Sequence, residues 1–233
     1  YCSTGANCGI GLETARVLAK SGSIVTITSR SANNGNDAVA TIKAENPQAN
    51  VSMMILDLTS FASIRKFAAD YKATGKPLHL LINNAGVMNC PKTITSEGLE
   101  LQFGTNHIGH FLLTQLLVDV LKSSGTREEP ARIINLSSIG NYLFAPAEGI
   151  LLNDLNAEKE YDPWVRYGMS KLANVVFTKQ LQRIFDNERA NVIAVALHPG
   201  GIADTNLARH SGSMVTTALK LIWRLSGDWT KLS

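Results

Sequence analysis

The sequence predicts an α/β protein with a doubly wound, Rossmann-type parallel sheet and helices on both faces. Short runs of apolar, β-branched residues alternate with longer segments in which apolar residues recur at helical spacing. The short runs are almost continuously apolar, which is typical of strands covered on both faces. Alternating strands and helices imply parallel strands joined by right-handed crossovers. We expect residues 1–233 to form a single Rossmann-type domain.

The expected elements follow this alternation along the chain. Strands are predicted at residues 1–3, 24–28, 51–56, 78–82, 133–136 and 192–197. Helices are predicted at residues 11–21, 36–45, 61–74, 97–121 and 164–187, and residues 140–162 are irregular apart from a short helix. The first strand is shorter than the roughly five residues that a strand needs. We therefore expect a fragment that is cut at its amino end and also at its carboxyl end.

Composition excludes several classes of function. Lys and Arg total 22 against 19 Asp and Glu, and the net charge of +3 comes without a basic stripe, so we expect no nucleic-acid partner. Cys2, Cys8 and Cys90 have neither a Cys-x-x-Cys pair nor zinc spacing, so no metal site is expected. No segment approaches the ~20 apolar residues of a membrane span. Membrane association and compartment stay open, with an intracellular place, cytoplasmic or at an organelle or endomembrane, expected.

A polar or glycine-rich cluster follows each predicted strand. In a doubly wound sheet, ligands bind beyond the carboxyl ends of the strands, so six such clusters on one edge predict a binding site. The clusters are residues 4–11, 29–30, 57–58, 83–86, 137–138 and 198–200.

The first cluster predicts a pyrophosphate site. Its glycines permit a tight turn in which free backbone N–H groups at a helix start meet the phosphates, although a plain strand-to-helix turn is the alternative. The residues expected to contact the cofactor in this loop are Gly5, Asn7, Gly9, Ile10 and Gly11.

Two further residues bear on the adenosine half of the cofactor. Arg30 stands where an arginine can bind a 2′-phosphate, which predicts a preference for NADP(H) over NAD(H). A solvated surface arginine is the alternative. Asp57 is expected either to make a turn or to contact the adenine together with Leu58, and both roles are compatible.

The predicted chemistry rests on Tyr167 and Lys171, which share a helix face at i and i+4. The phenol has an ordinary pKa of about 10, and we expect the lysine and an oxidised nicotinamide to lower it. Ser138 is expected to bind the substrate oxygen, and Asn106 to hold a water that relays protons through Lys171. A Tyr-x-x-x-Lys pair alone is more often a surface pair. The serine pair at a strand end supports the functional interpretation here.

Other candidate residues are expected to be structural. His107, His110 and His198 suggest a serine hydrolase, but the chain has no Gly-x-Ser-x-Gly elbow. Ser137 is expected to be structural as well, and Cys8 is given no redox role.

Together these motifs make the sequence resemble the short-chain dehydrogenase/reductase family over nearly its whole length. Within the family it is most similar to the retinol-dehydrogenase-like group, through residues 154–156, 161–164 and 170–174. The resemblance implies catalysis by Asn106, Ser138, Tyr167 and Lys171. The further cofactor contacts expected are Asn84, Ala85, Gly86, Tyr167, Lys171, Pro199, Gly200, Ile202 and Thr205. Thr205 stands one residue further from Pro199 than the family spacing.

We therefore expect an NADP(H)-dependent oxidoreductase that interconverts an alcohol and a ketone or aldehyde. Residues 139–166 and 201–233 are expected to cover the substrate, and the apolar, aromatic residues 140–146 favour a lipophilic one, although a packed loop explains them nearly as well. One alternative is a catalytically silent NADP(H)-binding sensor or interaction protein. An epimerase or lyase with the same tyrosine is another, and a homo-oligomer is left open.

Overall fold

The computed structural model describes residues 1–200 and 207. Six strands form one sheet in the order β3-β2-β1-β4-β5-β6, and every adjacent pair is parallel. The predicted Rossmann-type fold is confirmed. The strands are β1 (Cys2–Ser3), β2 (Val25–Ser29), β3 (Val51–Ile55), β4 (Leu80–Asn83), β5 (Ala131–Leu136) and β6 (Val192–Leu197).

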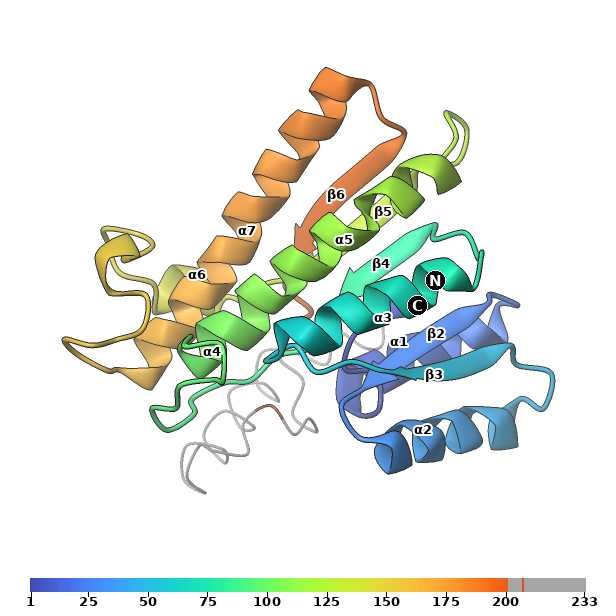
Figure 1. Ribbon diagram of the computed structural model, residues 1–233, viewed down its shortest axis with the longest axis horizontal. Coiled ribbons are helices and arrows are strands. Elements are labelled where there is room, and N and C mark those ends of the chain that lie inside the picture. Colours follow the sequence, from blue (N-terminus) through green and yellow to red (C-terminus); the bar gives the residue numbers. More distant parts are fainter. Residues whose placement is uncertain (201–206, 208–233) are drawn as a thin grey trace.

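Helices cover both faces of the sheet (Figure 1). One buried cluster joins α3, α5 and α7 to the central strands, and Ile64, Leu117 and Leu181 represent the three helices in it. A second cluster packs α1 and α2 against β2 and β3 through Ala15 and Ile42. The helices are α1 (Gly9–Lys20), α2 (Ala32–Glu45), α3 (Phe61–Ala73), α4 (Leu101–Phe103), α5 (Gly109–Ser124), α6 (Gly140–Leu143) and α7 (Pro163–Glu188).

The prediction of one continuous helix over residues 97–121 is wrong, because its first four residues are not helical and the remainder is divided. Residues 97–100 are not helical, because Glu100 pairs with Ile94 in an isolated bridge and its carboxylate caps α4. A π-helical stretch, Gly104–Ile108 (η1), then separates α4 from α5. Such widened turns often occur at functional sites, and this one contains Asn106.

The other boundaries differ by a few residues. α2 begins at Ala32 instead of 36, because the Ser31 side chain accepts a hydrogen bond from the Asn34 N–H and caps the helix there. β4 lies two residues later than predicted at its start. In the irregular segment 140–162, α6 is the expected short helix, and Leu152–Asp154 (η2) adds one 3₁₀ turn.

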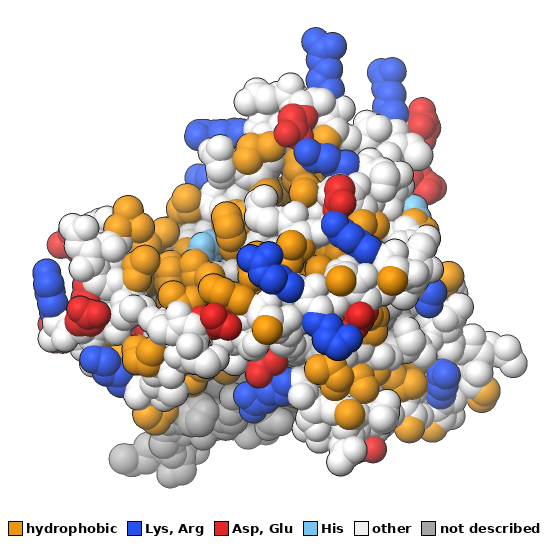
Figure 2. Space-filling model, viewed as in Figure 1, with side chains coloured by type: hydrophobic (Ala, Val, Ile, Leu, Met, Phe, Trp, Pro, Cys, Tyr) orange, Lys and Arg blue, Asp and Glu red, His pale blue; other side chains and the backbone are white. Residues whose placement is uncertain are grey.

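Hydrophobic side chains remain on the surface over α5 and α7 (Figure 2). The exposed residues of these helices include Phe111, Val176 and Ile184. Among residues 1–200 and 207, no helix is long and apolar enough to cross a membrane. The same residues contain no group of three His, Cys, Asp or Glu side chains that could hold a metal ion.

Candidate active site

The loops after β1 and β4 are joined by one buried threonine. The Thr4 hydroxyl accepts hydrogen bonds from the backbone N–H groups of Asn84 and Ala85, both at 2.9 Å. In return, Asn84 Nδ2 donates to the Thr4 carbonyl at 2.7 Å. Two of the predicted cofactor loops are therefore fixed to each other. Thr4 lies in the predicted cluster 4–11 but was not among the residues expected to contact the cofactor.

His110 completes this junction from α5. Its Nδ1 lies 3.0 Å from the Asn106 carbonyl, which only accepts, so Nδ1 carries the proton and Nε2 accepts from the Thr4 hydroxyl at 2.8 Å. Burial lowers the pKa of His110 to about 3, so the ring is neutral. The predicted structural role of His110 agrees with these contacts. His107 similarly hydrogen-bonds Asn174 Oδ1 at 3.1 Å, and burial lowers its pKa.

Close packing explains why glycine occupies two positions of the glycine-rich segment. Gly5 has a φ of +59°, and a Cβ there would lie 2.8 Å from the Ala85 Cβ. At Gly11 a Cβ would lie 2.5 Å from Asn84 Nδ2 and 2.8 Å from the Gly5 carbonyl oxygen. Cys8, the N-cap of α1, makes no side-chain cap. The first N–H groups of α1 are therefore not capped by the Cys8 side chain. Asn7 lies in the loop before the helix, and Gly9 and Ile10 are the first two residues of α1.

Arg30, Asp57 and Leu58 were expected near the adenosine half of the cofactor. Arg30 follows β2 and is exposed. Asp57 makes the turn that its sequence position suggests, since its Oδ1 accepts from Thr59 N at 2.9 Å and from Thr59 Oγ1 at 2.7 Å. Contacts of Arg30, Asp57 and the buried Leu58 with a cofactor stay predictions.

Asn106 fixes the backbone that follows Gly86. Its side-chain amide pairs with both backbone groups of Val87, accepting at 2.8 Å and donating at 2.9 Å, and it also donates to Ser170 Oγ at 3.0 Å. A Cβ on Gly86 would lie 3.3 Å from Asn106 Oδ1 and 3.5 Å from Lys171 Nζ. The structure thus brings Gly86, Asn106 and Lys171 together, while the water relay through Asn106 stays a prediction.

Tyr167 and Lys171 lie on α7 at the end of β5, as the serine pair suggested. Their side chains are 3% and 4% exposed. Lys171 Nζ donates to the Leu136 carbonyl at 3.0 Å and lies 5.7 Å from the centroid of the Tyr167 ring. Ser137 Oγ donates to the Lys171 carbonyl at 2.9 Å, which agrees with its expected structural role.

The electrostatics of this pair differ from the expectation. Burial raises the pKa of Tyr167, and a hydrogen bond with the Ser138 side chain opposes that rise without cancelling it. Burial also lowers the pKa of Lys171 to about 8. The chain's own residues therefore do not lower the phenol pKa. The reason is that desolvation of a nearly inaccessible phenol outweighs the stabilisation of the phenolate by its neighbours.

The last predicted cluster is only partly described. Pro199 and Gly200 follow β6 at the same edge of the sheet, and Gly200 has a φ of +85°. Ile202 and Thr205 lie outside the described residues. His198, directly before Pro199, is exposed and is not joined to Ser138 by any hydrogen bond among the described residues.

Comparison with known proteins supports the same interpretation. The short chain dehydrogenase family model matches residues 2–147. The chloroplastic short-chain dehydrogenase TIC 32 A of Brassica napus is 45% identical over 210 residues, covering 90% of this chain and 65% of that protein. Mouse retinol dehydrogenase 12 is 43% identical over 228 residues, covering 98% and 67%. The chain thus spans about two thirds of the length of these relatives.

A solved structure extends the similarity to three dimensions. The Pseudomonas aeruginosa RhlG/NADP active-site complex superposes with a TM-score of 0.69 at 25% identity, covering 90% of this chain and 73% of that one. The family match spans the glycine-rich loop and the Asn83–Gly86 and Ser137–Ser138 clusters that the fold gathers at one edge. With this sheet, these loops and these relatives, the chain belongs to the short-chain dehydrogenase family.

Proposed function

We propose that this protein is an NADP(H)-dependent oxidoreductase that interconverts an alcohol and a ketone or aldehyde. The observation that carries the proposal is the position of Ser138, Tyr167 and Lys171 at the carboxyl end of β5, with Lys171 close to Gly86 in the loop that packs against the glycine-rich loop. A bound nicotinamide dinucleotide supplies the hydride in the reducing direction and accepts it in the oxidising direction.

The chain's own residues handle the proton. In reduction, the phenol of Tyr167 donates its proton to the carbonyl oxygen of the substrate, which becomes the hydroxyl of the product. Ser138 holds that oxygen by a hydrogen bond within reach of the phenol. The ammonium of Lys171 stabilises the phenolate that the proton transfer leaves. Because burial raises the pKa of Tyr167, the protein favours the protonated phenol that reduction requires.

The cofactor fits the loop after β1 for steric and electrostatic reasons. Cβ atoms at Gly5 and Gly11 would collide with Ala85 and Asn84, so glycine is needed where the loop and the start of α1 pack against the residues after β4. The uncharged first turn of α1 suits a pyrophosphate. The exposed Arg30 is free of described ion pairs, and it supports a 2′-phosphate contact. The similarity to a protein solved with NADP supports the same preference.

A lipophilic substrate is the class that the segment after β5 favours. The side chain of Tyr142 on α6 is 82% exposed, and Ile139, Leu143 and Leu152 are exposed large hydrophobic residues of the same segment. Phe144 and Trp164 pack against Tyr167 itself. The name of the mouse relative refers to retinol, a lipophilic alcohol, which supports the same class for this chain.

The first experiment tests the role of Tyr167. The full-length protein is assayed with NADPH against retinaldehydes, steroid ketones and long-chain aldehydes, and NADPH binding is measured separately by fluorescence. Tyr167→Phe should abolish turnover and keep NADPH affinity, while Tyr71→Phe, a control on α3 whose hydroxyl donates to the Pro77 carbonyl, should keep both. Retained turnover in Tyr167→Phe would refute the role. Tight NADPH binding without turnover of any carbonyl by the wild type would favour the silent sensor.

The second experiment tests the cofactor preference. Arg30→Ala should raise KM for NADPH at least tenfold and leave KM for NADH unchanged, because only NADPH carries the 2′-phosphate. Arg65→Ala, which removes an exposed arginine of α3, is the matched control. Equal or better kinetics with NADH in the wild type would contradict the preference.

A further inference from the structure

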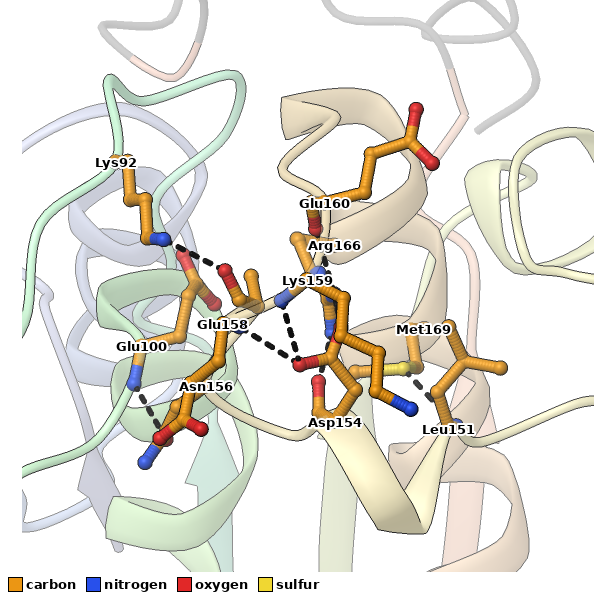
Figure 3. Close-up of polar contacts among 11 residues, drawn as sticks. Lys92, Glu100, Leu151, Asp154, Asn156, Glu158, Lys159, Glu160, Arg166 and Met169 are labelled. Atoms are coloured by element: carbon orange, nitrogen blue, oxygen red, sulfur yellow. Dashed lines mark hydrogen bonds and ion pairs between the residues drawn. The ribbon is translucent and has the colours of Figure 1, made fainter.

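Arg166, which directly precedes Tyr167 on α7, carries a guanidinium buried to 2% exposure. A charge so deeply buried needs close partners, since removal from water costs several kcal/mol. Nη2 donates to Asp154 Oδ2 at 2.6 Å and to the Glu160 carbonyl at 2.9 Å, and Nη1 donates to the Asp154 carbonyl. These bonds attach residues 154–160 to the helix turn that carries Tyr167 (Figure 3).

Asp154 is itself held rigidly. While Oδ2 binds Arg166, its Oδ1 accepts from the backbone N–H groups of Glu158 at 2.7 Å and Lys159 at 3.3 Å. The Ala157 N–H donates to the Asp154 carbonyl at 3.1 Å. The carboxylate thus closes a turn with one oxygen and binds α7 with the other. A change at Asp154 therefore disturbs both.

The same turn is held on its opposite side by the segment that follows β4. Lys92 Nζ donates to the Ala157 carbonyl at 2.6 Å, and the Glu100 N–H donates to Asn156 Oδ1 at 3.2 Å. Figure 3 shows these contacts on one side of the turn and Arg166 on the other. Met88, in the segment after β4, packs against Tyr167. The turn at 154–160 therefore connects α7 to the segment after β4, which also contains Met88.

Glu100 extends this connection toward Asn106. Its buried carboxylate accepts from the N–H groups of Gln102 at 2.9 Å and Phe103 at 2.8 Å, which starts α4 directly before η1. Burial raises the pKa of Glu100, and the positive charge of Arg166 opposes that rise. Glu100, at the start of α4, and Arg166, on α7, thus both hold the turn at 154–160.

We propose that Arg166 is a positioning residue for the Tyr167 phenol, acting through its ion pair with Asp154; this inference rests on the proposed function of Tyr167. Gly140, Phe144 and Trp164 contact the ring and limit its position on the side of α6. The Arg166–Asp154 pair fixes the helix turn from which the ring projects. The rate of a positioned reaction is sensitive to displacements of about 1 Å, which can cost roughly a hundredfold.

The first test compares Arg166→Met, Asp154→Asn and Arg166→Lys in the full-length protein. For Arg166→Met we expect kcat to fall about tenfold or more, with the Kd for NADPH changed less than twofold and the pH profile of kcat displaced. Asp154→Asn should act in the same direction, and Arg166→Lys should recover part of the loss. Arg183→Met, at an exposed position of α7, is the matched control and should behave as wild type.

A purely structural role gives a different pattern. If Arg166→Met lowers thermal stability but keeps kcat per folded protein and the pH profile of the wild type, the proposal is refuted. If Arg166→Met does not fold, Arg166→Lys and Asp154→Asn decide by the same criteria.

The second test needs no turnover. The absorbance of phenolate is measured against pH in the cofactor-free wild type and in Arg166→Met. The same curve of the corresponding protein with Tyr167→Phe is subtracted from each, so that the difference reports Tyr167. Loss of the ion pair should admit water to the phenol and shift the Tyr167 pKa down toward its ordinary value of about 10. An unchanged pKa overturns the proposal. If the wild type reduces no carbonyl, the proposed function fails, and this titration still decides the positioning role.

Discussion

His110 makes folding stability depend on pH in a way that one substitution can isolate. Its imidazole is buried and neutral between the Thr4 hydroxyl and the Asn106 carbonyl. Protonation would turn the acceptor Nε2 into a donor and break the bond from Thr4. The pKa of His110 is about 3 in the folded protein, against about 6.5 in the unfolded chain.

These two pKa values fix the sign and size of the effect. Between pH 6.5 and pH 3 the unfolded chain binds one more proton at this residue, so the free energy of unfolding falls as the pH falls. The stabilisation is fully present above about pH 6.5. Between pH 7 and pH 5, the titration of His110 alone should lower the free energy of unfolding by about 2 kcal/mol.

Urea unfolding at pH 7 and pH 5 measures this difference. The wild type should lose about 2 kcal/mol more than His110→Gln, which cannot titrate in this range. At pH 7 the variant should be less stable by about 1–3 kcal/mol, because the buried Thr4 hydroxyl loses a well-placed acceptor. His79→Gln, at an exposed position, is the control and should keep the wild-type pH dependence. Equal losses in wild type and His110→Gln would refute the reasoning.

Three further substitutions give separate expectations. Lys171→Met should abolish turnover and raise stability at pH 7 by about 1–3 kcal/mol. Burial lowers the pKa of Lys171 to about 8, so the buried ammonium destabilises the fold below pH 8, and this cost disappears as the pH rises from 8 toward 10.5. A variant that is less stable than the wild type in urea contradicts this. Gly168→Ala should lower stability by about 1–3 kcal/mol and kcat with it, since its Cβ would lie 2.5 Å from the Ala145 backbone nitrogen; a wild-type thermal midpoint and kcat would count against it. Gly11→Ala should weaken NADPH binding at least tenfold in calorimetry, since its Cβ would lie 2.5 Å from Asn84 Nδ2; unchanged affinity would show that the loop adapts.

The fold and the place of the site could be predicted because both depend on local patterns. Five of the six strands are short, mostly apolar runs, and the clusters after them needed only the rule that parallel strands end at one edge. The i to i+4 spacing of Tyr167 and Lys171 required nothing beyond helix geometry. The error at residues 97–121 has a local cause that hydrophobic spacing does not show, because the Glu100 carboxylate caps α4. It also has a tertiary cause, because the Glu100 N–H donates to Asn156 Oδ1.

The sequence by itself determined the parallel sheet, the glycine-rich loop and the residues gathered around Ser138, because backbone geometry and hydrophobic periodicity act over a few residues. Only the tertiary structure decided how those residues are held. Thr4 meets His110 across 106 positions, and Arg166 is buried against Asp154 by the folding of an irregular segment. Burial likewise decided that the phenol pKa of Tyr167 rises, since desolvation depends on everything packed around the ring.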